Sequence, residues 1–381
     1  MKKMKIIGVI CEYNPFHLGH LYQINKIKEK YNDCIIVAIV SSCFTQRGEV
    51  CIINKWDKAK IALDYGIDIV LELPFLYATS SADIFAKGAI TILNKIGIDT
   101  LVFGTECDDI DTLKELAYIQ LNDDNYDTIV KSYLDRGYNY PSSLNKALFD
   151  ISGVMVDKPN DLLALSYIKQ VMLINNSIDI INIKRTNDYH SKVIDGDIIN
   201  ASLIRKYIIE NKDISNFIPN YDFNYIYKDY SINNYYPILK YQIINNIDNL
   251  DKFLTVDEGI ENRIKKYINI SNSWDELVNN IKTKRYTYNK INRMLIYILT
   301  NLTKKETEEL MGSYYIRVLG FNDKGKNYLN KIKKEVDIIT KYIKNKNKLF
   351  DLENRINNIY SLYTDSKLIN DEYTHKPIIK D

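Results

Sequence analysis

Two histidines near the start of the chain have the side-chain type and the spacing to act on a phosphate. His17 and His20 stand three residues apart, on either side of Leu18 and Gly19. Residues three apart at a helix start lie on one face, so both imidazoles face the same group. The free N–H groups of a helix start, and a glycine without a Cβ, admit a phosphate close to the backbone. The pattern predicts phosphoryl chemistry in which two imidazole donors stabilise the shifting charge.

The structural alternative is that one histidine caps the helix and the other packs against the core. A short motif of this kind also occurs by chance, which leaves both interpretations open for an isolated match. The flanking sequence favours the phosphate interpretation. Residues 6–11 are predicted to form a buried strand, Pro15 forbids its continuation, and Leu21, Ile24 and Ile27 follow at helical spacing. A strand, a bent loop and a helix form the first unit of a nucleotide-binding sheet.

The alternation of strand and helix continues through the first half of the chain. Strands are expected at 34–40, 69–73, 100–103 and 178–183, and helices at 55–65, 81–96, 110–152 (several), 160–173 and from residue 200 or 202. This predicts an α/β fold with a doubly wound, parallel, Rossmann-like sheet. From residue 212 long helices are expected at 236–247, 260–270, 275–283, 288–302, 326–347 and 351–362. We therefore expect a catalytic domain over 1–211 and a mainly α-helical domain over 212–381.

Composition narrows the class of protein. The formal net charge is only +2, but residues 211–381 hold 28 Lys and Arg against 22 Asp and Glu, which suits a polyanionic partner. Five cysteines without a CxxC pair favour reduced thiols over disulfides or zinc. No apolar stretch is long enough to span a membrane, and the N-terminal apolar run is too short for a secretion signal. We expect a soluble, cytoplasmic protein.

Ligands of such sheets bind beyond the carboxyl ends of the strands. The polar candidates at these ends are Glu12, Asn14, His17, His20, Gln46, Arg47, Gly104, Glu106, Arg185, Ser202 and Arg205. Several have a structural alternative: a loop cap for Glu12, a surface charge for Arg47, and a turn glycine for Gly104. For Arg185 the alternative is a solvated pair with Lys184. For Ser202 and Arg205 it is a helix cap and its neighbour. The functional interpretation is binding of phosphate, carboxylate or nucleoside.

Seven segments occur in an order that resembles one family. They are EYNPFHLGH, SSCFTQRGE, ELPF, SADIFAKGA, FGTE, PNDLLALSY and IKR, spread over residues 5–210. They are similar to those of the tRNA(Met) cytidine acetate ligase family, within the HxGH nucleotidyltransferase superfamily. The resemblance implies that ATP and acetate form acetyl-adenylate and pyrophosphate, and that the acetyl group passes to N4 of the wobble cytidine of elongator tRNA(Met).

The resemblance also implies the site. The catalytic pair is His17 and His20. The ATP-binding residues are Ile10, Cys11, Glu12, Tyr13, Asn14, Pro15, Phe16, His17, Leu18, Gly19, His20, Leu21, Tyr22, Gln23, Gly104, Asn160 and Arg185. Gln46, Arg47, Ser202 and Arg205 are further candidates for the substrate or a phosphate. Mg²⁺ is expected with the triphosphate, no protein ligand for a metal is assigned, and no membrane, DNA or obligate protein partner is expected.

The chain departs from the family pattern at three places. The pattern reads HNGH, SGNF and DKW, whereas Leu18, Cys43 and Asn54 interrupt these motifs here. Leu18 is expected to have little effect. Cys43 replaces an amide that we expect near the reactive site, and it would act as a nucleophile only with a lowered pKa.

Basic residues interleaved with Tyr286 and Tyr288 are the candidates for binding tRNA. They are Lys282, Lys284, Arg285, Lys290 and Arg293, with a second lysine-rich stretch at 324–348. The alternative is an ordinary solvated helix face. Two rival functions remain open: a small-molecule adenylyltransferase of cofactor biosynthesis, and a non-catalytic RNA-binding protein on a degenerate nucleotide fold.

Overall fold

A computed structural model describes residues 4–185, 198–226, 230–344 and 346–381 of the chain. Its centre is a mixed sheet with the strand order β5-β4-β1-β2-β3-β6-β7, and β8 pairs with β6. The strands are β1 (Lys5–Cys11), β2 (Cys34–Ser41), β3 (Ile69–Leu73), β4 (Thr100–Thr105), β5 (Asp179–Lys184), β6 (Ile316–Asn322), β7 (Ile338–Ile339) and β8 (Ile378–Lys380). The first five are parallel, and β6 runs antiparallel to β3. The predicted α/β class with a parallel-dominated sheet is confirmed.

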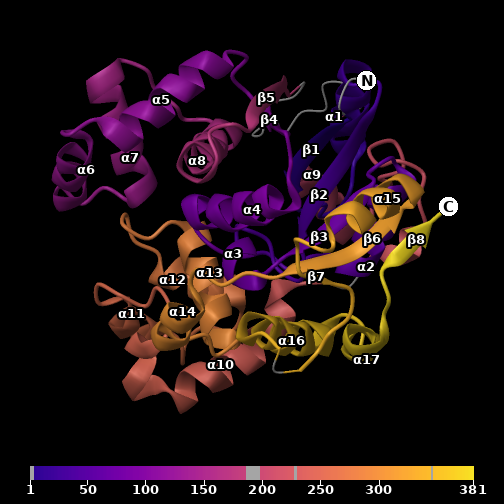
Figure 1. Ribbon diagram of the computed structural model, residues 1–381. Coiled ribbons are helices and arrows are strands. Elements are labelled where there is room, and N and C mark those ends of the chain that lie inside the picture. Colours follow the sequence, from indigo (N-terminus) through magenta and orange to yellow (C-terminus); the bar gives the residue numbers. More distant parts are fainter. Residues whose placement is uncertain (1–3, 186–197, 227–229, 345) are drawn as a thin grey trace.

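The first five strands form where apolar, β-branched runs predict them. All eight residues of β2 are buried, as expected for a strand covered on both faces. Helices connect the parallel strands in the expected order (Figure 1). They are α1 (Leu18–Lys30), α2 (Lys55–Asp64), α3 (Phe75–Ala78), α4 (Ala82–Ile96) and α8 (Pro159–Ile174), and α9 (Ala201–Ile209) follows β5. This alternation brings the loops after β1, β2, β4 and β5 to one edge of the sheet.

Three helices between β4 and α8 extend to one side of the sheet (Figure 1). They are α5 (Ile110–Asn122), α6 (Tyr126–Asp135) and α7 (Tyr140–Ser152). The N-termini of α5 and α7 are capped, since the Asp109 and Asn139 side chains accept backbone N–H groups of the first turn. This helical cluster forms one wall of the cavity described below.

The C-terminal half is mainly helical, as expected. Its helices are α10 (Tyr236–Asn245), α11 (Ile260–Tyr267), α12 (Trp274–Ile281), α13 (Tyr288–Leu299), α14 (Lys304–Leu310), α15 (Asp323–Ile332), α16 (Lys348–Tyr360) and α17 (Lys367–Thr374). Short 3-10 turns lie at Phe223–Tyr225, Ile232–Tyr235, Ile247–Lys252 and Ser361–Tyr363. Helices α10 to α13 lie below the α5–α7 cluster in Figure 1, and α16 and α17 lie beneath the sheet.

Two features of this half differ from the sequence analysis. The helix predicted over 326–347 is confirmed only as far as Ile332, where α15 ends, and is wrong beyond it. The strand β7 follows, since β-branched Val336, Ile338 and Ile339 favour extended backbone. Strands β6, β7 and β8 were not predicted, and β6 pairs with β3 of the first half. The sheet therefore contains strands from both sides of residue 211, and the division into domains there stays a prediction.

Candidate active site

The two histidines hold the start of α1 together. His17 is the residue that precedes the helix, and its Nδ1 accepts the Gly19 N–H at 3.0 Å. The His17 N–H in turn donates to Nδ1 of His20 at 3.2 Å, which completes a reciprocal capping box. The rings stack with centroids 3.8 Å apart. A Cβ at position 19 would lie 2.8 Å from His17 Cε1, so only glycine fits at position 19. The capping alternative is thus correct in part, and it applies to both rings.

Capping also fixes the chemistry of the rings. Because Nδ1 of each imidazole accepts a backbone N–H, the ring proton of each neutral histidine lies on Nε2. Burial, with Arg185 and Arg205 nearby, lowers the pKa of His17 to about 3. Burial and the neighbouring His17 lower the pKa of His20 as well. At neutral pH the site therefore presents two uncharged rings, each with one N–H donor that the helix does not use.

The loop before the histidines is tied to distant segments. Asn14 donates to the Val50 carbonyl at 3.3 Å and accepts the Ile52 N–H at 2.8 Å. The Tyr221 hydroxyl donates to the Phe16 carbonyl at 2.9 Å. These contacts hold a loop whose Tyr13 adopts a positive φ of 45°, a conformation that favours glycine. Elements from both halves of the chain therefore fix where the imidazoles lie.

A cavity of about 1020 Å³ opens beside this loop. That is the upper end of the range of small-molecule sites, roughly 300–1000 Å³. Twenty predicted residues line it: Ile10, Cys11, Glu12, Tyr13, Asn14, His17, Gly19, His20, Tyr22, Gln23, Gln46, Arg47, Gly104, Asn160, Arg185, Ser202, Arg205, Arg285, Lys290 and Arg293. The cavity lining does not include Pro15, Phe16, Leu18, Leu21, Lys282 or Lys284. The candidate ATP, phosphate and tRNA residues thus largely converge on one space.

Arg185 has donor capacity that the described protein groups leave unused. It follows β5, and its side chain packs beside Gly104, where a Cβ would lie 3.4 Å from Arg185 Cγ. Its Nε atom is buried without a hydrogen-bond partner among the described residues. Burial lowers the pKa of this guanidinium from its ordinary value. A buried arginine nitrogen of this kind needs an acceptor, and a phosphate oxygen fits its geometry.

The start of α8 holds the loop after β4. Asp161 is buried and accepts the Glu106 N–H at 2.8 Å and the Cys107 N–H at 3.0 Å. The neighbouring Asn160 donates to the Glu106 carboxylate. Asn160 therefore reaches the cavity from a fixed position. The sequence analysis did not single out Asp161, although it stands directly after Pro159 and Asn160 at a helix start, where acidic residues are favoured.

The loop after β2 touches both β1 and the C-terminal half. Its Gln46 N–H donates to Glu12 at 2.6 Å, and its Gln46 carbonyl accepts the Arg293 guanidinium at 3.0 Å. Gly48 has a φ of 78°, and a Cβ there would lie 2.7 Å from the backbone nitrogen of Arg293. Close packing of this turn on α13 therefore requires glycine. Arg47 lines the same cavity, and burial lowers its pKa.

Arg205 holds the loop before the histidines in place. It donates to the Asn14 carbonyl at 2.7 Å, pairs with Glu49 and also contacts Ser202 Oγ at 3.2 Å. Helix α9 begins after Asn200, whose side chain accepts the Leu203 N–H. These contacts agree with the structural alternative for Ser202 and Arg205, and their binding of phosphate stays a prediction.

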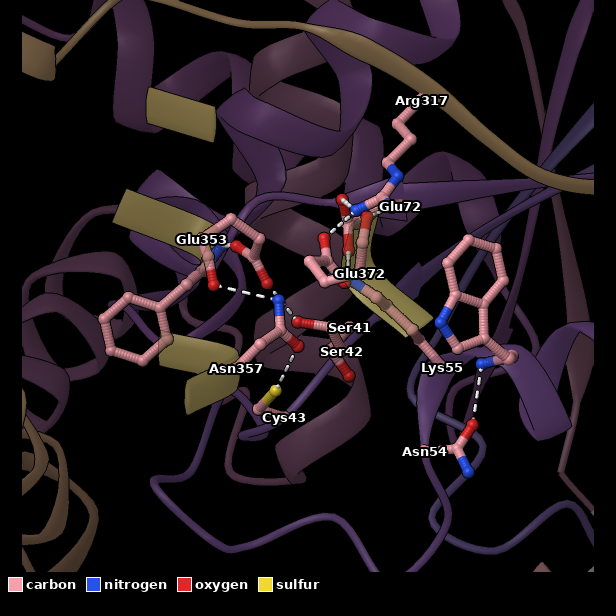
Figure 2. Close-up of polar contacts among 12 residues, drawn as sticks. Ser41, Ser42, Cys43, Asn54, Lys55, Glu72, Arg317, Glu353, Asn357 and Glu372 are labelled. Carbon is pink, nitrogen blue, oxygen red and sulfur yellow. Dashed lines mark hydrogen bonds and ion pairs between the residues drawn. The ribbon is translucent and has the colours of Figure 1, made fainter. Parts of the chain in front are cut away.

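Figure 2 shows the surroundings of two departures from the family pattern. The Cys43 thiol donates to Asn357 Oδ1 at 3.1 Å and does not line the cavity. Burial, with Glu353 nearby, raises the pKa of this thiol well above its ordinary value, which excludes a ready nucleophile. The expectation that Cys43 lies at the reactive site is therefore wrong. Asn54 accepts the Trp56 N–H at 2.9 Å as the cap of α2, a role that aspartate also fills.

A buried cluster of charges is drawn above Cys43 in Figure 2. Lys55 contacts Glu72 at 2.6 Å and Glu372 at 2.7 Å, and Arg317 of β6 pairs with the same two carboxylates. Glu353 of α16 accepts the Ser42 hydroxyl and the Phe75 N–H. The cluster joins β3, β6, α2, α16 and α17, so it stabilises the attachment of the C-terminal elements to the sheet.

The candidate tRNA residues differ in their surroundings. Lys284 and Arg285 are exposed, and Arg285 also lines the cavity. The Lys282 and Lys290 ammonium groups lie over the rings of Tyr288 and Tyr286, at 4.8 and 4.0 Å. The Arg293 guanidinium donates to the Gln46 carbonyl. Contact of all five with RNA stays a prediction.

Among the described residues, no three His, Cys, Asp or Glu side chains are grouped to hold a metal. Over the same residues, no helix is long and apolar enough to cross a membrane. A Mg²⁺ ion at this site would therefore be held mainly by nucleotide phosphates and water.

Comparison with known proteins places this chain in a family. The HIGH Nucleotidyl Transferase family model matches residues 4–375. A Caldicellulosiruptor bescii protein named tRNA(Met) cytidine acetate ligase is 38% identical, with 98% of each chain covered. The chain belongs to the tRNA(Met) cytidine acetate ligase family. A Clostridium perfringens member is 37% identical over 99% of this chain and all of its own length. The crystal structure of the Thermotoga maritima member TmcAL bound with alpha-thio ATP has a TM-score of 0.87 at 28% identity and covers 99% of each chain. The sequence-based family assignment is confirmed, and with it an enzyme of the ligase class.

Proposed function

We propose that this enzyme activates acetate with ATP and acetylates N4 of the wobble cytidine of elongator tRNA(Met). The observation that carries the proposal is the capping box: it aligns two neutral imidazoles, each with an N–H on Nε2, on the cavity that Arg185 also lines. Membership in the ligase family supports the choice of acetate and tRNA(Met) as substrates. A tRNA substrate also suits a cytoplasmic protein.

In the first step, the acetate carboxylate attacks the α-phosphorus of ATP and pyrophosphate leaves. His17 and His20 donate to the phosphoryl oxygens whose charge rises, and Arg185 supplies a further buried donor. Since the rings are neutral at pH 7, they act as hydrogen-bond donors and transfer no proton in this step. Magnesium, when bound to the triphosphate, would neutralise part of its charge. No protein nucleophile is needed.

In the second step, the cytidine must reach the acetyl-adenylate in an unstacked form, as bases of single-stranded loops can. Arg285 and Lys290 of the C-terminal half line the same cavity as His17 and His20. An anticodon loop gripped at Arg285 and Lys284 would therefore place a base close to the nucleotide. Acetate itself is too small to be selected by binding energy, so exclusion of larger acids must come from the shape of the pocket.

The test is mass spectrometry of elongator tRNA(Met) after incubation with the enzyme, ATP and isotopically labelled acetate. The proposal predicts one labelled acetyl group, located on the wobble cytidine, and its absence when ATP is omitted. A small-molecule adenylyltransferase would leave the tRNA unchanged under these conditions. An unlabelled tRNA despite complete formation of acetyl-adenylate would refute the tRNA part of the proposal.

A further inference from the structure

The transfer of acetyl to a cytidine amine requires a proton acceptor, and the cavity contains few candidates. The amine of cytosine is a weak nucleophile, and its nitrogen becomes acidic once it bonds to the acetyl carbon. A positioned base speeds such steps typically 10²–10⁴-fold. The histidines are poor candidates, because Nδ1 of each accepts a backbone N–H and burial lowers the pKa of both. The base must come from another group.

Five carboxylates line the cavity, and their surroundings separate them. Glu49 pairs with Arg205, and Asp83 pairs with Lys169 at 2.7 Å, so cations already hold both. Asp135, at the end of α6, and Glu258, before α11, are exposed to solvent. Glu12 is different: it stands directly after β1, on the loop that leads to His17, and forms no ion pair with a described residue. The charges of Arg47 and Lys58 favour its ionised form, but burial outweighs them.

Glu12 is also held in a fixed position. Its Oε1 accepts the Gln46 N–H at 2.6 Å. The Gln46 peptide is in turn held by the Arg293 guanidinium on its carbonyl, and the Gln46 side chain donates to the Ser80 carbonyl at 3.0 Å. Helix α13, whose start carries the candidate RNA contact Lys290, thus fixes the segment that positions Glu12. Arg293 is by this argument a positioning residue.

We propose that Glu12 is the general base of acetyl transfer, an inference that rests on the proposed function. The N4 lone pair of cytidine forms a bond to the carbonyl carbon of acetyl-adenylate. The bond between that carbon and the phosphate oxygen breaks, and AMP leaves with the electron pair. The proton of the amine passes to the Glu12 carboxylate. Burial raises the pKa of Glu12 above its ordinary value, which makes the carboxylate a better proton acceptor.

Two other roles would also place a carboxylate here. One is a purely structural role, in which Glu12 only holds the Gln46 loop, and the other is binding of a magnesium ion during adenylation. The variant Glu12→Gln separates these roles, because the amide oxygen still accepts the Gln46 N–H but the side chain neither takes up a proton nor carries charge. Glu29→Gln is the matched control, since Glu29 lies on the exposed face of α1 and pairs with Lys26.

The experiment measures two partial reactions in each variant: acetate-dependent pyrophosphate–ATP exchange, and single-turnover transfer from preformed acetyl-adenylate to tRNA(Met). We expect Glu12→Gln to lower transfer at least about 100-fold more than it lowers exchange, and Glu29→Gln to keep both. Normal transfer by a folded Glu12→Gln, or equal loss of both reactions, would overturn the role of Glu12. Absence of exchange in the unmodified enzyme would instead overturn the proposed function.

The unmodified enzyme provides a second readout, which stands even where Glu12→Gln unfolds. Its single-turnover transfer rate should fall as the pH decreases through the raised pKa of Glu12, while exchange follows a different profile. A transfer rate at saturating tRNA that shows no fall at any pH above 4.5, the ordinary pKa of a glutamate, would contradict a carboxylate base with a raised pKa.

Discussion

The backbone N–H of His17 donates to Nδ1 of His20, and the two rings stack with centroids 3.8 Å apart. The contact that begins helix α1 is therefore also the contact that orients the candidate catalytic pair. Each ring therefore has a structural and a chemical role on different atoms: Nδ1 is used for the fold, and Nε2 is left for a ligand.

The two roles of His17 are separable by substitution. His17→Asn keeps a side-chain oxygen that caps α1, whereas His17→Ala removes the cap. We expect the alanine variant to be less stable than the asparagine variant by about 1 kcal/mol. Both should lose pyrophosphate–ATP exchange by about 100-fold or more, since neither carries the imidazole donor. Urea unfolding and the exchange assay check this, and an asparagine variant with normal exchange would contradict the catalytic role.

The burial of His17 makes the protein sensitive to acid. An unfolded histidine takes up a proton near pH 6.5, while folded His17 stays neutral until about pH 3. Between these values the unfolded state binds more protons, so the free energy of unfolding falls as the pH decreases, by about 1.4 kcal/mol per pH unit for one such group. Urea unfolding from pH 4 to 6 should show a slope that is smaller in His17→Asn. An unchanged slope would mean that His17 is charged in the folded protein.

Glu353 should show the opposite dependence. Burial and the neighbouring Glu72 raise its pKa to about 7, above the ordinary 4.5. From pH 4.5 to 7 the folded state keeps a proton that the unfolded state has lost, so stability from this group decreases as the pH rises. We expect Glu353→Gln to raise the thermal unfolding temperature at pH 8 and to do so less at pH 5. The stabilisation at pH 8 should be roughly 1–3 kcal/mol. A variant that is less stable at pH 8 would show that the charged carboxylate is needed by Lys55.

Lys284 and Arg285 provide the test of the RNA surface. Both are exposed and form no ion pair within the described residues, so their charge reversal should leave the fold and adenylate formation intact. Lys284→Glu with Arg285→Glu should weaken tRNA binding and reduce its dependence on salt, since fewer phosphate contacts remain. Filter binding at several salt concentrations measures this. Lys305→Glu, on the first turn of α14, is the control charge reversal. An equal loss of tRNA binding there would indicate that only the net charge of the protein matters, and not these two positions.

The sequence predicts the first half of the fold well because its signals are local. Strands β1 to β4 contain apolar runs rich in β-branched residues. The starts of α2, α5, α7 and α9 carry capping residues whose side chains accept backbone N–H groups. Strand β6 was missed because its sequence contains Arg317 and Gly320, which do not suggest a buried strand. Arg317 is buried only because Glu72 and Glu372, far away in the sequence, neutralise it. Contacts between residues so far apart in the sequence leave no local pattern from which the strand could be predicted.

The same limit applies to the site. The motif around His17 and His20 was visible, and the loops after the strands converge on one cavity as expected. The contacts that fix the site were not visible: Arg205 on the Asn14 carbonyl, and Arg293 on the Gln46 carbonyl. Each joins residues more than 190 positions apart. Arg293 could be seen from the sequence only as one basic residue among several.

The most direct measurement is acetate-dependent pyrophosphate–ATP exchange by His20→Ala, compared with the unmodified enzyme at pH 7.5. The paired imidazoles predict exchange in the unmodified enzyme and a loss of about 100-fold or more in the variant, with a cooperative unfolding transition retained. Normal exchange in a folded His20→Ala would contradict the claim that this pair stabilises the reacting phosphoryl group.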